Sequence, residues 1–144
     1  MKLFVLIILT FLLSFQEAGA KDNSKSVCYL KDRFFIQQVN DINLNPQDYK
    51  DKIIQIEGLF NKYVDENNVE RYVVYRKTAG CCGDDGSSGF EFAYKKEKLN
   101  FKPEQWILVE ARVAERTAKG RNHVIIYLEA TSVVEKPKGK EFVM

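Results

Sequence analysis

Five segments between residues 53 and 134 share one pattern, which restricts the chain to a small set of folds. Each is a run rich in β-branched and aromatic residues that ends at a turn or a polar loop. In the first segment, Ile54, Ile56, Gly58 and Phe60 fall on one face of an extended chain. The sequence therefore predicts five strands in an all-β domain: Ile53–Tyr63, Val69–Arg76, Phe90–Tyr94, Gln105–Arg116 and His123–Val134.

A charged connector lies between the third and the fourth of these strands, where a helical turn is easily formed. This plan predicts a small five-stranded OB-fold-like barrel over residues 33–136, with a short helix between strands three and four. A two-sheet sandwich is the alternative, although it normally needs more strands. Residues 33–39 alternate weakly and are assigned to a strand rather than a helix. We expect residues 21–32 to be a flexible N-terminal extension and residues 137–144 a loose tail.

The first 20 residues have the layout of a secretory signal. Lys2 precedes an apolar run from Leu3 to Leu13, and the small residues Ala18-Gly19-Ala20 follow it. The run is shorter than the roughly 20 residues of a membrane span, although an uncleaved anchor is the alternative. Cleavage after Ala20 leaves 144 − 20 = 124 residues. We therefore expect an exported protein that is periplasmic, extracellular or associated with the cell envelope, without stable membrane insertion.

Composition excludes several classes of function. The 22 Lys and Arg residues against 20 Asp and Glu residues give a formal charge of +2, which lacks the basic excess of a nucleic-acid binder. A hydrophobic content of 45% is sufficient for a packed core. We find no Ser/His/Asp motif, phosphate-binding loop or nucleophile elbow in the sequence. We expect a protein that is not an enzyme.

The segment Gly80–Gly86 (GCCGDDG) is the one stretch whose residue choice packing does not explain. Its glycines permit close backbone approach around two thiols and two carboxylates. One hypothesis is a zinc-like metal site. Cys81 and Cys82 would be its ligands, and the candidates to complete it are Asp84, Asp85, Cys28 and His123. The difficulty is spacing, because structural zinc sites favour two to four residues between paired cysteines, whereas these two are adjacent.

A disulfide is the second hypothesis, since an exported protein meets an oxidising compartment. A bridge from Cys28 to Cys81 or Cys82 would leave one thiol unpaired, whereas a bridge between the adjacent cysteines would be strained. The protein would then be a disulfide-stapled interaction module that binds a peptide, a glycan or an envelope protein through the barrel face. A thiol-exchange role and a calcium site at Asp84, Asp85 and Glu91 are weaker hypotheses.

Aromatic residues are frequent in the second and third predicted strands. They either fill the core or form a stacking face for sugars or bases, as barrels of this plan allow. The residues concerned are Tyr72, Tyr75, Phe90, Phe92 and Tyr94. Of these, Tyr75 and Phe90 are the candidate ligand-binding residues.

Several runs of the chain resemble a known family. They are Phe34–Ile42, Asn45–Lys52, Ile56–Phe60 and, most specifically, Gly80–Gly86. Together they resemble bacterial extracytoplasmic OB-fold proteins of uncharacterised function, which are similar to the soluble domain of two-component permease subunits. In that family the paired cysteines follow an arginine-bearing strand, which the resemblance matches to Arg76 as a further ligand-binding candidate. Related permease systems are associated with zinc homeostasis, so the resemblance implies Zn²⁺ as ligand and an envelope or permease protein as partner.

This chain departs from the permease subunits in having no transmembrane bundle in its sequence, so transport is not implied. Asp51 also stands where the family often has glycine before Lys52. The sequence as a whole predicts an exported OB-like barrel that acts as a binding or accessory protein. Its ligand, a metal ion or a small molecule, would bind at the Gly80–Gly86 loop.

Overall fold

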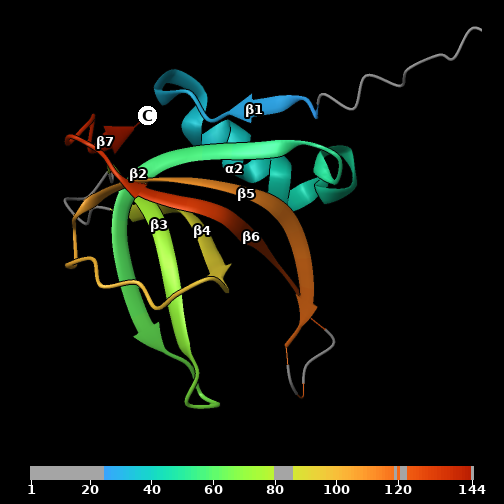
Figure 1. Ribbon diagram of the computed structural model, residues 1–144. Coiled ribbons are helices and arrows are strands. Elements are labelled where there is room, and N and C mark those ends of the chain that lie inside the picture. Colours follow the sequence, from blue (N-terminus) through green and yellow to red (C-terminus); the bar gives the residue numbers. More distant parts are fainter. Residues whose placement is uncertain (1–24, 80–85, 119, 121–122, 144) are drawn as a thin grey trace, which may run out of the picture.

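The computed structural model describes residues 25–79, 86–118, 120 and 123–143, and these form a β-barrel with a helix beside it (Figure 1). The elements in chain order are β1 (Val27–Tyr29), the 3₁₀ turn η1 (Asp32–Phe34), α2 (Phe35–Leu44), the 3₁₀ turn η2 (Pro46–Tyr49), β2 (Ile53–Val64), β3 (Glu70–Thr78), β4 (Gly86–Tyr94), β5 (Trp106–Thr117), β6 (Val124–Glu135) and β7 (Phe142–Val143).

Strands β2 to β6 close on themselves in the cyclic order β2-β5-β6-β4-β3, because β3 also pairs with β2. Four of these pairings are antiparallel. The fifth, between β4 and β6, is parallel and joins Phe92–Tyr94 to Leu128–Ala130. The five-stranded OB-fold-like barrel that the sequence predicts is confirmed, and each predicted strand corresponds to an observed one.

Two glycines allow the barrel to curve tightly around Tyr75 of β3. A Cβ atom at Gly89 of β4 would lie 2.1 Å from the carbonyl oxygen of Val74. A Cβ atom at Gly58 of β2 would lie 2.5 Å from the carbonyl oxygen of Tyr75. Any side chain at either position would push neighbouring strands apart, so glycine is needed here for close approach of the strands.

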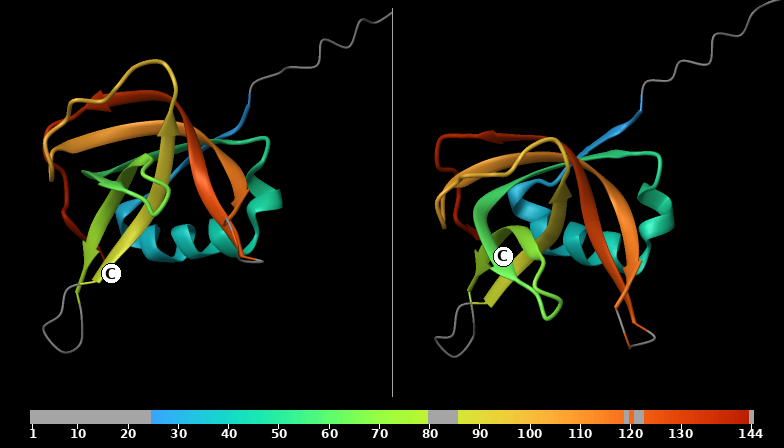
Figure 2. Two further views of the ribbon diagram at one scale, coloured as in Figure 1. Left: turned by 90° about the horizontal axis from the view of Figure 1, so that it is seen from below. Right: turned by 60° about the horizontal axis from the view of Figure 1, so that its bottom comes forward.

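The core lies inside the barrel and under α2, which covers one opening of the barrel (Figure 2). Ile54, Ile56 and Phe60 of β2 are fully buried, as their alternation predicts. From the helix, Phe35, Val39 and Ile42 point into the same core at the spacing of one helical face.

The helix corrects two expectations. The strand that the sequence predicts over residues 33–39 is wrong, because α2 begins at Phe35 and continues to Leu44. Alternation and helical spacing coincide over so short a window, and the buried Ile42 beyond it decides for a helix. The short helix also lies before β2 rather than between the third and fourth barrel strands. Residues 95–105 form only turns and irregular chain there, since α2 already covers the opening.

The glycine-rich segment 77–89 is also more regular than its composition predicts. Thr78 pairs with Gly86, and Lys77 pairs with Ser87, so both ends of the segment belong to the β3–β4 hairpin. Gly89 serves the close approach of β4 to β3 and not a turn. Residues 80–85 lie outside the described part of the chain.

Both described ends of the chain pair with the barrel, where the sequence predicts flexible segments. β1 runs parallel to the start of β2, with Cys28 opposite Ile54. β7 runs parallel to the end of β3, and its Val143 is buried. Before β7, Gly139 packs against the indole of Trp106, where a Cβ atom would lie 2.6 Å from the ring. Among the described residues, none of the helices has the length and apolar character required to span a membrane.

Candidate ligand-binding groove

The outer face of β2, β3 and β4 carries a regular grid of side chains, because alternate residues of neighbouring strands come into register. Asn61 of β2 lies opposite Val73 of β3, and Val73 lies opposite Glu91 of β4. In the next row towards the β3–β4 loop, Tyr75 lies opposite Gly89. Gly89 adds no side chain to this row, and the backbone of β3 closely approaches it. A hollow lies on this face and is lined in part by Tyr75 and Gly89.

This hollow is a groove of about 440 Å³, within the size range of small-ligand sites. Its lining is aromatic and polar, and comes from β2, β3 and β4: Asn61, Lys62, Tyr63, Val73, Tyr75, Ser87, Gly89, Phe90 and Glu91. We call it the β2–β4 groove.

A second hollow, of about 340 Å³, lies between the β2–β3 turn and the β5–β6 turn. Its lining consists of Tyr63, Val64, Asp65, Glu66, Asn67, Arg116, Ala118 and Ile125. Tyr63 lines both hollows, and its side chain is 44% exposed. The β2–β4 groove and this turn hollow are therefore neighbours that share one tyrosine.

Glu91 holds Tyr63 in place. The tyrosine hydroxyl donates a hydrogen bond of 2.8 Å to Glu91 Oε2. One guanidinium nitrogen of Arg116 donates to both carboxylate oxygens at 2.8 and 2.7 Å, and Arg71 lies 3.8 Å away. Burial and the hydrogen bond to the Glu91 carboxylate raise the pKa of Tyr63 above its usual value. Arg116 Nε is buried without a hydrogen-bond partner among the described residues. The positive charge of this guanidinium is therefore balanced mainly by the Glu91 carboxylate.

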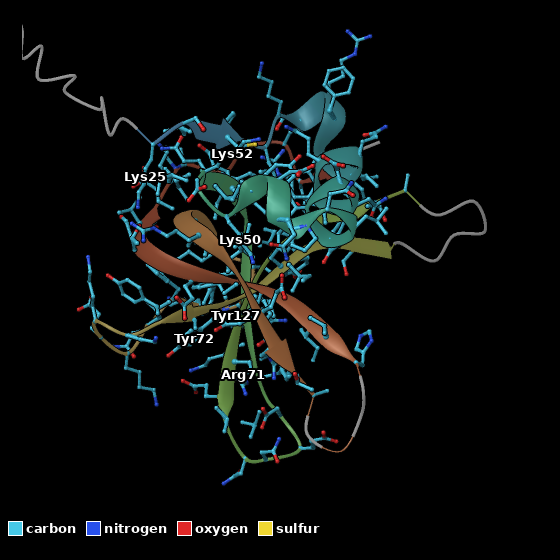
Figure 3. The ribbon with its side chains drawn as sticks, turned by 90° about the vertical axis from the view of Figure 1, so that its right-hand side faces the viewer. Lys25, Lys50, Lys52, Arg71, Tyr72 and Tyr127 are labelled. Carbon is cyan, nitrogen blue, oxygen red and sulfur yellow. The ribbon has the colours of Figure 1, made fainter. Side chains whose placement is uncertain are left out.

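A second ion pair fixes the β2–β3 turn. Arg71 donates to Asp65 through Nε and Nη2, both at 2.9 Å. Asp65 also accepts hydrogen bonds from the backbone N–H groups of Val69 and Asn67. The hydrogen bond from Val69 is the main cause that holds the pKa of Asp65 below its usual value. Figure 3 shows Arg71 on this hairpin, at the end of the molecule away from Lys50 and Lys52.

The three residues predicted to bind a ligand fall in two places. Tyr75 and Phe90 both line the β2–β4 groove, although Phe90 is largely buried in the core. Arg76 points inward and is 1% exposed. Tyr75 thus lies on the outer, groove-facing side of β3, whereas the side chains of Phe90 and Arg76 are buried inside.

Arg76 is held where β3 separates from the first half of β2. Its Nε donates a hydrogen bond of 2.7 Å to the carbonyl oxygen of Glu57, and its Nη1 pairs with Asp32. The guanidinium carbon lies 4.8 Å from the ring centre of Phe35 and 5.1 Å from that of Trp106. These contacts assign Arg76 to the joining of β2, β3 and the helical segment.

Of the predicted metal ligands, only Cys28 and His123 lie within the described residues. Cys81, Cys82, Asp84 and Asp85 lie outside the described residues. Cys28 is half-buried in β1, where burial raises the pKa of its thiol, and His123 is exposed at the β5–β6 turn. β1 and that turn lie at opposite ends of the molecule (Figure 1). Within the described ranges, no cluster of three His, Cys, Asp or Glu side chains is placed to hold a metal ion.

Sequence reasoning missed Tyr63 as a groove residue, missed Arg71 and Arg116 as partners of Glu91, and proposed Glu91 only as a calcium ligand. The missing information was register. Only the pairing of Tyr63 with Arg71, and of Val73 with Glu91, brings these side chains together. The signal available in the sequence was a set of charged residues at outward positions of predicted strands.

The fold and the groove define a small OB-fold-like barrel protein with a hollowed outer face. The chain belongs to the family described as the DUF1980 C-terminal domain, whose profile matches residues 13–143. Among solved structures, the chain is similar to the N-terminal domain of PriB protein from Thermoanaerobacter tencongensis. The identity is 6% and the TM-score 0.35, and the match covers 60% of this chain and 97% of that one. A comparison with curated proteins found no match.

Proposed function

We propose that this protein is an exported binding module whose ligand lies in the β2–β4 groove. The observation that carries the proposal is the pair Tyr63 and Tyr75, two aromatic side chains that line the same groove of about 440 Å³. Barrels of this plan commonly bind ligands on the face of their second and third strands, which here are β3 and β4. Export is supported by the signal-like sequence of the first 20 residues.

The groove favours binding over catalysis. Its acid, Glu91, is engaged by Tyr63 and Arg116, and is 14% exposed. A general acid or base needs a free position next to the substrate and a pKa tuned to its task. Glu91 instead fixes a tyrosine ring, which is a positioning role suited to recognition.

Metal binding at the Gly80–Gly86 loop is the second candidate, supported by the two adjacent thiols and two carboxylates of its sequence. The loop joins β3 to β4, and Ser87 of the groove lies just after it. A Zn²⁺ ion held by Cys81 and Cys82 would therefore be close in sequence to the groove. A bridge between Cys28 and one of these cysteines is the competing use of the same thiols.

Two measurements separate these uses of the cysteines. Elemental analysis of the reduced protein should find zinc in the wild type and not in Cys81→Ser/Cys82→Ser. Intact mass with and without reduction should show three free thiols if zinc is the ligand, whereas a bridge lowers the mass by the two hydrogens lost. Absence of zinc in the reduced wild type rejects the metal candidate and leaves the groove proposal intact.

The partner we propose is an envelope or permease protein, for which the accessory role follows from the resemblance to soluble domains of permease subunits. The groove would then present a bound ligand to that partner. Co-purification with a permease of the same organism would support the accessory role, and a protein that purifies without any permease would count against it.

The groove itself is tested by mapping backbone amide chemical shifts during titration with three probes: chitohexaose, a capped Ser/Thr/Val-rich peptide and oligo(dT). We expect one probe to shift amides of Asn61, Tyr63, Tyr75 and Gly89. Saturable shifts confined to other strands, or none with any probe, would reject the groove as the binding site.

A further inference from the structure

We infer that the ligand of the β2–β4 groove is a neutral oligosaccharide that extends into the turn hollow. The inference rests on the proposed function and adds the class of ligand. It starts from the charges around the two hollows, which are arranged to neutralise one another.

Among the described residues, each cation that lines the two hollows faces a carboxylate. Arg116 is bound to Glu91, and Lys62 lies 3.5 Å from Glu70. Beside them, Arg71 is bound to Asp65. Phosphate or carboxylate recognition needs a cation whose donors are available to the ligand. At Arg116 and Arg71 such a ligand would have to displace a carboxylate that is 14% or 10% exposed, and at Lys62 it would compete with Glu70 on the surface.

Within the described linings of the two hollows, the charge without a partner is negative. Among the charged residues of the described lining, Glu66 alone makes no ion pair, and it is exposed at the β2–β3 turn. A polyanion such as a nucleic acid would approach this carboxylate, which opposes binding. Electrostatic complementarity therefore favours an uncharged ligand.

The groups that are available suit a ligand with many hydroxyl groups. Asn61 and Ser87 can donate and accept hydrogen bonds, and both are exposed. Tyr63 and Tyr75 add aromatic rings, whose faces attract the weakly positive C–H groups of a sugar ring. The Tyr63 hydroxyl is fixed by Glu91, so its ring is already positioned before a ligand arrives.

The dimensions suit a short chain of sugars. From Tyr75 to Arg71 along β3 the distance is about 13 Å at ~3.3 Å per residue, roughly the length of two or three linked pyranose rings. Because Tyr63 lines both hollows, a chain that leaves the groove can continue into the turn hollow. A peptide strand would instead need a free strand edge, and at these residues β3 is paired on both sides, with β2 and with β4.

Isothermal titration of the full mature chain with chitohexaose tests the inference. We expect Tyr63→Ala and Tyr75→Ala to weaken binding at least about tenfold each, equivalent to about 1.4 kcal/mol. The matched control is Tyr29→Ala, which removes a similarly exposed tyrosine from β1 and should leave affinity unchanged. The fold of each variant is checked by its circular dichroism spectrum.

The outcomes are distinguishable. If the peptide or oligo(dT) binds in the groove and chitohexaose does not, the ligand class is wrong and the binding module stands. If chitohexaose binds equally to Tyr63→Ala, Tyr75→Ala and Tyr29→Ala, its site lies elsewhere and the inference is overturned. If no probe binds in the groove, the proposed function itself fails.

Discussion

Replacing Arg76 by alanine should destabilise the protein far more than replacing its partner Asp32. The substitution removes the Nε–H group that donates a hydrogen bond to the carbonyl oxygen of Glu57. Leaving a buried acceptor without a partner lowers the free energy of unfolding by about 1–3 kcal/mol. It also removes a desolvated cation between Phe35 and Trp106, for which each contact contributes about 1–2 kcal/mol. Because these effects overlap, we expect a loss of about 4 kcal/mol in the free energy of unfolding.

Asp32 differs because it is 50% exposed. In Asp32→Ala, water can reach the Arg76 guanidinium at that end, so we expect a loss of only about 1 kcal/mol. Arg76→Met keeps most of the aliphatic volume without the donors and should fall between the two. This variant also guards against an Arg76→Ala protein that does not fold.

The assay is urea unfolding followed by circular dichroism, with the fluorescence of the chain's single tryptophan as a second probe. With a denaturant dependence of about 1.5 kcal/mol per molar, Arg76→Ala should lower the midpoint by about 2.5 M and Asp32→Ala by less than about 1 M. If Asp32→Ala costs as much as Arg76→Ala, the ion pair dominates and the packing argument is refuted.

Three further predictions concern the barrel. Gly89→Ala should cost about 2–3 kcal/mol, because its Cβ atom would lie 2.1 Å from the Val74 carbonyl oxygen. Gly120→Ala, at φ +78° in open space, should cost only about 1 kcal/mol; equal urea midpoints for the two variants would contradict the close approach of β3 and β4. The Val69 N–H lowers the pKa of Asp65 in the folded protein, so its stabilisation is complete above the unfolded pKa of about 3.9 and is lost as the pH falls through the lower folded value. Asp65→Asn should flatten the acid side of the stability profile, and an unchanged profile would exclude this cause. Deletion of residues 139–144 should uncover Trp106 and shift its emission to longer wavelength, whereas an unchanged spectrum would show that the C-terminal segment does not cover it.

The strands were predictable because buried and exposed residues alternate along them, and this alternation can be recognised in a short stretch of sequence. Ile54, Ile56 and Phe60 alternate, and all three are buried. The helix was not predictable, because residues 33–39 fit the alternation of a strand as well as the spacing of a helix. Its distinguishing residue, Ile42, lies beyond that window. The pairing of β7 could not be predicted, because two residues carry no periodicity.

The candidate groove was predictable only in part. Tyr75 and Phe90 follow from their strands, and the structure places both in its lining. The contact of Arg116 with Glu91 joins β5 to β4, which are not neighbours in the sheet. No spacing in the sequence encodes such a contact. Arg76 shows the converse, since the family resemblance suggested it as a ligand-binding residue and it is instead buried inside the fold.

The most direct test of the groove uses a fluorescent reporter placed within it. Tyr63→Trp puts an indole where the β2–β4 groove meets the turn hollow, whereas the native Trp106 is buried beneath the C-terminal segment. We expect a saturable change in emission when chitohexaose is added to Tyr63→Trp, and no change for the control Tyr29→Trp. An equal response in both variants, or a response only in Tyr29→Trp, would contradict this prediction.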